Sequence, residues 1–335
     1  MPPAGHIHVA VVGAGSWGTT VAALAAGNAP TVLWARRESL ARQIDETHIN
    51  GDYLPQFGLP VTLRATNDME RAVASADVVV MAVPSHGFRE VATQVAQHIR
   101  PWVPVVSLTK GLEADTSKRM SEVTAEEMPG HPVAVLTGPN LAQEVLAGQP
   151  AASVVAIADT VIAAELQRIF SRQTLRIYTN PDVVGCEVGG VVKNVIAIAA
   201  GMTEGMGFGS NTRATLITRG LSEMARLGVA LGAQANTFAG MAGMGDLIAT
   251  CSSRQSRNNM VGIQLGQGRS IADIIASTNQ VAEGVRSSPS VLALARRYGV
   301  EMPITEQIVA VCHHGVTPAD ALAAVMQRSR KSEMP

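Results

Sequence analysis

Aromatic side chains are scarce in this sequence. Phe, Trp and Tyr together account for 3% of the 335 residues, whereas hydrophobic residues of all kinds account for 47%. Ala, Val, Ile and Leu must therefore supply most of the packing in the interior. A chain of this length can bury a large core and can form two domains.

Cysteine and net charge are low as well. The three cysteines, Cys186, Cys251 and Cys312, lie far apart and lack the spacing of metal ligands, so we expect no metal site and a reducing, cytoplasmic environment. A net charge of −1 offers no electrostatic attraction for nucleic acid or for an acidic membrane surface. The opening segment has no basic region followed by an apolar stretch and a cleavage site, so we expect no signal peptide.

Long apolar runs are also missing. Gly, Lys or Glu interrupts each apolar stretch before it would reach the length of a membrane span. Internal repeats and low-complexity linkers are absent too. We therefore expect a soluble globular protein without stable membrane insertion.

The first half of the sequence alternates short β-branched runs with helical patterns, which indicates a parallel sheet covered by helices. The expected strands are 7–12, 31–36, 61–66, 77–83, 103–109, 131–137, 152–157 and 175–179, with helices such as 86–99 and 159–170 between them. Long helical patterns then take over at 183–204, 211–231, 258–267, 285–298, 304–313 and 318–328. We predict an α/β fold with a doubly wound, mostly parallel Rossmann-like domain over 1–182 and an all-α domain over 183–335.

The segment Gly13-Ala14-Gly15-Ser16-Trp17-Gly18 fits the pattern G-x-G-x-x-G. It follows an expected strand and opens an Ala-rich helix, which is the context of a dinucleotide-binding loop. In such a loop the first glycine makes the tight turn, the second lets the backbone approach a pyrophosphate, and the third permits close helix–strand packing. The N–H groups at the helix start then bind the phosphate. The alternative is a plain tight turn.

Arg36 and Arg37 follow the second expected strand, where an NAD site normally has an acidic residue. An acid there bonds the ribose 2′-hydroxyl, whereas guanidinium groups attract and bind a 2′-phosphate. We therefore expect NADPH as the preferred cofactor, with NADH as the alternative reductant. The competing interpretation is a pair of solvated arginines at the start of a loop.

Lys193 is the only charged residue between Glu187 and Glu204, in a helical pattern that is apolar on nearly all sides. A buried lysine is costly without a partner or a task. Burial lowers the pKa of a lysine, which suits a proton-transfer group near neutral pH. The alternative is an ordinary surface lysine with a partly covered stem.

The segment 243–262 combines Asp246 with an expected helix start. Ser256 is the expected N-cap, followed by Arg257, Asn258 and Asn259 in the first turn. An arginine there opposes the helix dipole unless the turn binds an anion such as a ligand phosphate. The alternative is an exposed cap with an isolated arginine.

Two further segments follow expected strands, at the sheet edge where ligands bind in open α/β folds. SLTKGLE (107–113) carries Lys110, which is long enough to reach a phosphate. The alternative is an ordinary solvated lysine in a loop. TGPNLAQE (137–144) occupies the corresponding position after the next strand.

Together these motifs resemble the bacterial-type NAD(P)-dependent glycerol-3-phosphate dehydrogenase family. The resemblance runs from about 7 to about 325 and rests on GAGSWGT (13–19), LWARR (33–37), YLP (53–55), AVPSH (82–86), SLTKGLE (107–113), TGPN (137–140), VVKNVIAIAAG (191–201), GMGDLIATC (243–251), SRN (256–258) and VAEGV (281–285). It implies reversible reduction of dihydroxyacetone phosphate to sn-glycerol 3-phosphate, the entry point to glycerophospholipids. We also expect a homodimer.

The resemblance also implies roles for individual residues. Lys193 is the implied proton donor or acceptor, with Asp246 as its partner. The implied cofactor contacts, beyond the glycines, are Ser16, Trp17, Arg36, Arg37, Lys110, Ala142, Arg257, Val281 and Glu283. The implied substrate contacts are Lys110, Gly138, Asn140, Lys193, Asp246, Ser256, Arg257 and Asn258. The family usually has Ser-Phe where this chain has Asn140-Leu141, which leaves the contact at 140 open.

Two other functions remain open. A 2- or 3-hydroxyacid dehydrogenase shares the Rossmann-plus-helical plan and a lysine early in the helical part, but binds a carboxylate. The SRN segment at a helix start favours a phosphate instead. A non-catalytic NADPH sensor would have no need of Lys193 and Asp246.

Overall fold

The aliphatic runs of the first half form one twisted sheet. The computed structural model describes residues 7–277 and 282–327. The strands are β1 (Val9–Val12), β2 (Thr31–Trp34), β3 (Leu63–Thr66), β4 (Val78–Met81), β5 (Val105–Ser107), β6 (Val133–Thr137), β7 (Ala151–Ala156) and β8 (Leu175–Asn180). They lie in the order β3-β2-β1-β4-β5-β6-β7-β8, and every neighbouring pair is parallel except β6 and β7. The predicted doubly wound, mostly parallel sheet is confirmed.

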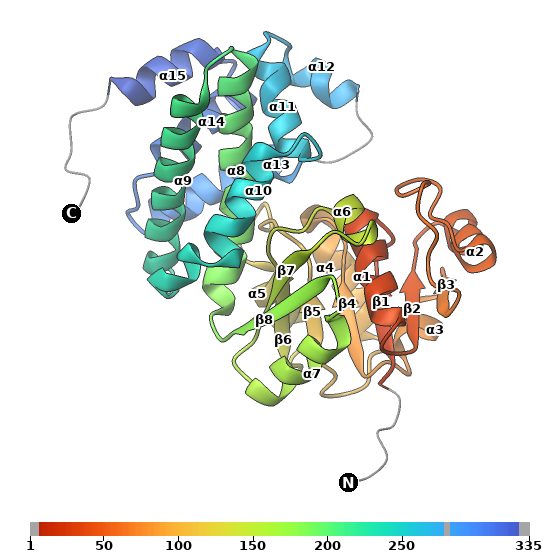
Figure 1. Ribbon diagram of the computed structural model, residues 1–335. Coiled ribbons are helices and arrows are strands. Elements are labelled where there is room, and N and C mark those ends of the chain that lie inside the picture. The colour runs from red at the N-terminus through yellow and green to blue at the C-terminus, as the bar shows by residue number, and fades with distance from the viewer. Residues whose placement is uncertain (1–6, 278–281, 328–335) are drawn as a thin grey trace.

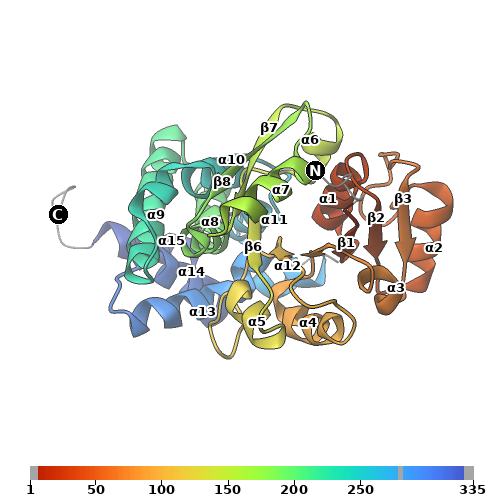
Figure 2. The ribbon, with the colours of Figure 1, turned by 90° about the horizontal axis from the view of Figure 1, so that it is seen from below.

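Helices cover both faces of this sheet, as Figure 2 shows. They are α1 (Ser16–Ala26), α2 (Glu38–Thr47), α3 (Met69–Val73), the short 3-10 helix η1 (Ser85–Gly87), α4 (Phe88–Ala96), α5 (Met120–Glu127), α6 (Ala142–Leu146) and α7 (Thr160–Phe170). Along β1, Val9 and Val11 belong to one hydrophobic core, and Ala10 and Val12 belong to the other. This alternation follows from the two-residue period of a strand, and it explains why the central strands are apolar throughout.

Every regular element in the rest of the described chain is a helix (Figure 1). They are α8 (Val183–Gly205), α9 (Ser210–Ala230), η2 (Ala235–Ala239), the π-helix η3 (Met241–Gly245), α10 (Asp246–Ser252), α11 (Arg257–Gly266), α12 (Ile271–Ala276), α13 (Glu283–Arg297), α14 (Pro303–His314) and α15 (Pro318–Met326). The sequence patterns predict the six longest of these within about three residues at each end. They miss the short helices η2, η3, α10 and α12. At η3 and α10 the reason is that the glycines at 243 and 245 give no helical signal.

One sequence-based expectation about α8 was wrong. Within residues 7–277 and 282–327, α8 is long and apolar enough to cross a membrane by length and composition, because Glu187 and Lys193 still leave the mean hydropathy of its most apolar window at 1.7. In the structure 89% of that window is buried inside the protein. The helix therefore serves as the central core helix of the second half, and its apolar character has that structural reason.

Close packing of α8 against α11 sets the relative positions of two candidate site residues. A Cβ atom on Gly201 would lie 2.1 Å from the carbonyl oxygen of Asn259, and one on Gly262 would lie 2.1 Å from that of Ile198. Only glycine allows the two backbones to approach this closely. The contact brings the start of α11, with Arg257, to the same side of the molecule as Lys193 on α8.

Candidate active site

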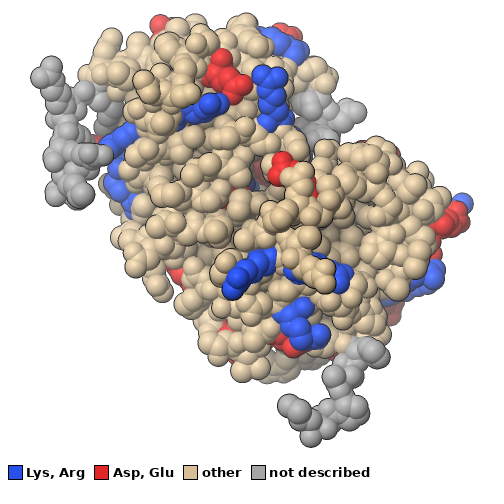
Figure 3. Space-filling view, viewed as in Figure 1, with Lys and Arg blue, Asp and Glu red and all other residues tan. Residues whose placement is uncertain are grey.

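A cavity of about 490 Å³ lies where the carboxyl ends of the strands face the helical half. Ligands bind at this edge in open α/β sheets. The predicted residues that line it are Gly13, Gly15, Ser16, Trp17, Gly18, Arg36, Arg37, Lys110, Asn140, Lys193, Ser256, Arg257, Asn258 and Glu283. On the face shown in Figure 3, charged side chains stand in small separate groups, in keeping with the near-neutral net charge. Five Lys and Arg residues nevertheless line this one cavity, namely Arg36, Arg37, Lys110, Lys193 and Arg257. The near-neutral composition gives no sign of this local concentration of positive charge.

Three of the predicted residues do not line the cavity. Asp246 lies directly behind Lys193, and the carbonyl oxygen of Gly138 accepts a hydrogen bond from Lys110 Nζ at 3.0 Å. Ala142 begins α6 next to the lining residue Leu141. Val281 lies outside the described residues.

The glycine loop leaves open space at the start of α1. Gly13 has a φ of 120°, and a Cβ on it would lie 2.5 Å from the carbonyl oxygen of Ala82. A Cβ on Gly15, by contrast, would have no atom of the described residues within 4 Å. Helix α1 has no side-chain cap and no acidic residue in its first turn. Its free N–H groups therefore face an open cradle that fits a pyrophosphate.

Arg36 and Arg37 lie just beyond the end of β2, and both are exposed. Arg37 donates a hydrogen bond from Nη2 to the carboxylate of Asp52, as an ion pair at the surface. Arg36 has no ion pair or side-chain hydrogen bond within residues 7–277 and 282–327. At least one guanidinium group is thus free to bind an anionic ligand at this end of the cavity.

Lys193, Asp246 and Lys110 form a buried charge cluster. Lys193 Nζ lies 2.5 Å from Asp246 Oδ1, and Lys110 Nζ lies 2.6 Å from Asp246 Oδ2. Lys193 is 6% exposed and Asp246 is 1% exposed, so the alternative of a surface lysine is wrong. Thr250 Oγ1 donates to the carbonyl oxygen of Asp246 at 2.6 Å and accepts from Lys193 Nζ at 2.7 Å. Two of the three ammonium hydrogens of Lys193 are therefore bound by the protein, and the third is left for the cavity.

The environment of Lys193 moves its titration toward neutral pH. Burial lowers its pKa from 10.5 to about 8, because the charged form loses its hydration. The carboxylate of Asp246 opposes this shift, and the charge of Lys110 adds to it. Lys193 can therefore exchange a proton at a pH near that of the cell.

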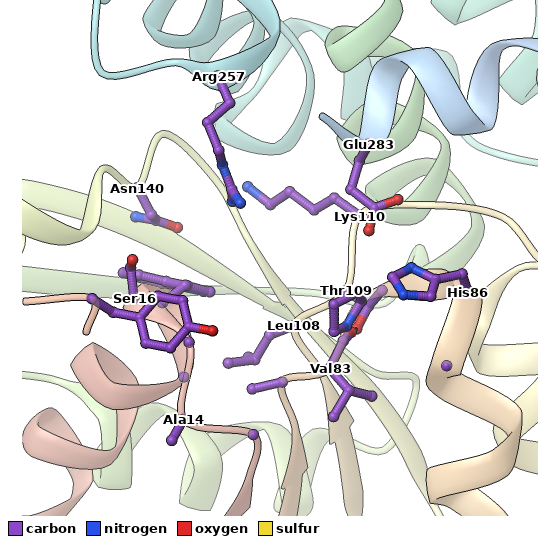
Figure 4. A pocket seen from close by; sticks show the side chains of 18 of the residues that line it. Ala14, Ser16, Val83, His86, Leu108, Thr109, Lys110, Asn140, Arg257 and Glu283 are labelled. Atoms are coloured by element: carbon purple, nitrogen blue, oxygen red, sulfur yellow. The ribbon is translucent and has the colours of Figure 1, made fainter. Parts of the chain in front are cut away.

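Arg257 enters the cavity from the helical half. Ser256 caps α11 as predicted, because its Oγ accepts the backbone N–H of Asn259 at 3.3 Å. Figure 4 shows the side chains of Arg257 and Lys110 pointing into the same pocket. The surrounding protein lowers the pKa of Arg257, while Glu283 and Tyr53 act in the opposite sense, and an arginine stays charged in any case. No hydrogen bond or ion pair to the described residues occupies its guanidinium, which leaves it available to an anion.

Asn194 and Thr250 belong to this site but were not predicted from the sequence. Asn194 Nδ2 donates to the carbonyl oxygen of Lys110 at 3.1 Å, and Asn194 Oδ1 accepts from Asn258 Nδ2 at 3.0 Å. Asn258 Oδ1 in turn accepts the backbone N–H of Gly284 at 2.9 Å. The signal for Asn194 was present, because it is a polar residue next to Lys193 in the same apolar helix. Thr250 could have been found as well, because it lies four residues, about one helical turn, after Asp246.

Asn140 and Glu283 are tied to neighbouring segments. Asn140 Oδ1 accepts from Ser153 Oγ at 2.8 Å, and its amide donates to the carbonyl oxygen of Ala152 at 3.2 Å. Glu283 accepts from the backbone N–H and from Oγ of Ser85, at 3.2 and 2.7 Å. Asn140 therefore keeps one N–H for a ligand, and Glu283 links α13 to the loop after β4 across the cavity.

Comparison with known proteins supports the family that the sequence motifs resemble. Two family models match, the NAD-dependent glycerol-3-phosphate dehydrogenase N-terminus over residues 8–163 and the C-terminus over residues 182–323. Proteins named glycerol-3-phosphate dehydrogenase (NAD(P)+) from Sphingopyxis alaskensis and Thermobifida fusca are 55% and 53% identical, and the matches cover 97% of this chain and 97% and 98% of theirs. A crystal structure of glycerol-3-phosphate dehydrogenase from Coxiella burnetii superposes with a TM-score of 0.92 at 36% identity, covering 96% of this chain and 99% of that one. The chain belongs to the NAD-dependent glycerol-3-phosphate dehydrogenase family.

Proposed function

We propose that this chain reduces dihydroxyacetone phosphate reversibly to sn-glycerol 3-phosphate, for glycerophospholipid synthesis in the cytoplasm, with NADPH as its preferred reductant. Residues 1–182 hold the cofactor, residues 183–335 hold most of the substrate, and the enzyme works as a homodimer. The observation that carries the proposal is the Lys193–Asp246–Lys110 cluster at the wall of a cavity that Arg36 and Arg257 also line, neither of which has an anionic partner among the described residues.

The cofactor end of the cavity is the glycine loop. The open cradle beside Gly15 accommodates the pyrophosphate, and Arg36 with Arg37 binds the 2′-phosphate that distinguishes NADPH from NADH. The other cofactor contacts are Ser16, Trp17, Lys110, Ala142, Arg257, Val281 and Glu283. When bound there, the reduced nicotinamide supplies the hydride that reduces the ketone carbon.

The substrate end combines charge attraction with a proton donor. Lys110 and Arg257 attract the phosphate, with Ser256 and Asn258 beside them at the start of α11. The third hydrogen of Lys193 bonds the ketone oxygen, polarises the carbonyl, and then passes to the oxygen as negative charge develops there. Asp246 and Thr250 hold the ammonium in place for this transfer. In the reverse direction neutral Lys193 accepts the proton.

A single kinetic experiment tests the proposal. Purified protein is assayed with NADPH and with NADH against dihydroxyacetone phosphate and a panel of 2- and 3-keto acids. We expect rapid oxidation of NADPH with dihydroxyacetone phosphate and little or none with the keto acids. A preference for a keto acid would favour the hydroxyacid dehydrogenase alternative, and binding without any turnover would favour a sensor. Light scattering on the same sample tests the homodimer.

A further inference from the structure

The loop after β5, residues 108–119, carries Lys110 and lies against α8. We name it the lysine loop. Its residue Leu112 belongs to the hydrophobic core of the helical half, together with Val188 and Val191 of α8. Although the loop leaves from the sheet, its packing therefore depends on α8, which rises from the sheet edge into the helical half (Figure 1).

One face of α8 contacts the loop at three levels. Glu187, Gly190 and Asn194 are three and four residues apart, so they line one side of the helix. At the upper level, Asn194 Nδ2 donates to the carbonyl oxygen of Lys110 at 3.1 Å. At the middle level, a Cβ on Gly190 would lie 3.3 Å from Lys110 Cγ, which shows that the lysine stem runs directly over this glycine.

The lowest level is a buried ionic contact. Glu187 is 5% exposed and accepts three hydrogen bonds, from Arg119 Nη1 at 2.7 Å, from the backbone N–H of Ser121 at 2.8 Å and from Ser121 Oγ at 2.5 Å. Burial raises the pKa of Glu187, and the charge of Arg119 with the two Ser121 donors counters this shift. Arg119 also pairs with Leu112 in an antiparallel bridge, so the contact reaches back into the lysine loop. None of these groups lines the cavity.

We propose that Glu187 is a positioning residue, which anchors the far end of the lysine loop on α8 and thereby holds Lys110 in register with Lys193 and Asp246. The loop is tied at both ends to one rigid helix, with Asn194 at the reacting end and Glu187 about 10 Å farther down the helix axis. Loss of the lower anchor lets the loop slide along α8, and the Lys110 ammonium then loses its place beside Asp246. This inference rests on the proposed role of Lys110 at the substrate phosphate.

The primary test is Glu187→Gln, compared with Glu223→Gln as a matched control. Glu223 is 1% exposed and accepts the backbone N–H groups of Ile304 and Thr305, so it caps α14 and contacts no part of the lysine loop. Both variants lose a buried carboxylate that accepts several hydrogen bonds, and both should melt at a lower temperature. The informative measurement is kcat/KM for dihydroxyacetone phosphate relative to that for dihydroxyacetone, taken well below both melting temperatures.

We expect this ratio to fall roughly tenfold or more in Glu187→Gln, because a small displacement of a positioned cation removes most of its benefit. In Glu223→Gln the ratio should stay at the wild-type value. A loss of thermal stability with an unchanged ratio in Glu187→Gln would overturn the inference, since Glu187 would then be a structural residue like Glu223.

Gly190→Ala provides a second perturbation that removes no charge and no hydrogen bond. The added methyl group pushes on the Lys110 stem at 3.3 Å while alanine suits the helix, so the ratio should fall without a loss of folding. If Glu187→Gln does not fold, this variant and Ser121→Ala decide the question, and wild-type ratios in both would overturn the inference. Lys110→Met distinguishes a failure of the Glu187 inference from a failure of the proposed role of Lys110. An unchanged ratio in this variant would refute the role of Lys110 at the substrate phosphate itself.

Discussion

Reduction and oxidation by this enzyme should depend on pH in opposite senses around the pKa of Lys193. Reduction of the ketone needs the ammonium form as proton donor, whereas oxidation of the alcohol needs the neutral amine as acceptor. Burial lowers this pKa from 10.5 to about 8. Between pH 7 and pH 9, kcat for reduction should therefore fall about tenfold, and kcat for oxidation should rise about tenfold.

The assay follows nicotinamide absorbance in both directions with all substrates saturating. Measurements begin near pH 7, because the substrate phosphate itself titrates at about pH 6. A kinetic isotope effect with deuterated NADPH establishes that the chemical step limits the rate across the range. A reduction rate that stays level up to about pH 9.5, with that isotope effect present, would refute the role assigned to Lys193.

The same pKa has a consequence for stability that does not depend on catalysis. Because the folded pKa of Lys193 is below the unfolded one, the unfolded chain binds more protons between pH 8 and pH 10.5, and this lysine makes the fold more stable as pH rises through that window. One pH unit is worth about 1.4 kcal/mol, so the gap between 10.5 and about 8 corresponds to roughly 3 kcal/mol. The free energy of unfolding, measured with a chemical denaturant, should therefore rise by that amount in wild type relative to Lys193→Met between pH 8 and pH 10.5. If the free energies of the two proteins changed in parallel with pH, the low pKa of Lys193 would be contradicted.

Two further predictions concern the arginines of the cavity. Replacing Arg36 and Arg37 together by Ala should weaken NADPH binding roughly tenfold or more and leave NADH binding nearly unchanged. The reason is that a charge-assisted contact to phosphate is worth roughly 1.5–3 kcal/mol. Equal losses of affinity for the two cofactors, measured by fluorescence titration, would exclude a 2′-phosphate site at these arginines. Arg257→Ala should raise KM for dihydroxyacetone phosphate much more than it impairs reduction of dihydroxyacetone, which has no phosphate to bind. Similar damage to both substrates would assign Arg257 to the cofactor or to the fold.

Local sequence signals predicted the elements whose chemistry is local. The glycine loop, the Ser256 cap and the buried Lys193 each follow from neighbours in the chain: the turn, the first helical residues and the apolar helix around the lysine. Such features depend on backbone conformation and periodicity, which a single sequence displays directly.

The contacts that complete the site depend on tertiary structure and could not be predicted in the same way. The sequence gives no sign that Lys110 reaches Asp246, because 136 residues and the sheet–helix junction separate them. The link from Asn194 to Lys110 and the anchor at Glu187 likewise arise only when α8 lies against the loop after β5. The π-helix at 241–245 escaped because its glycines allow many conformations, and packing against Phe238 and Gly189 selects one.

The most direct test of the central claim is the turnover of Lys193→Met. Methionine keeps the length and the apolar stem of the lysine, and Asp246 retains Lys110 as its partner, so the melting temperature and the affinity for NADPH should stay close to wild type. Single-turnover oxidation of bound NADPH by dihydroxyacetone phosphate should fall by roughly 10²–10⁴. A well-folded variant that keeps more than about a tenth of the wild-type rate, with the chemical step still rate-limiting, would contradict the claim that Lys193 transfers the proton.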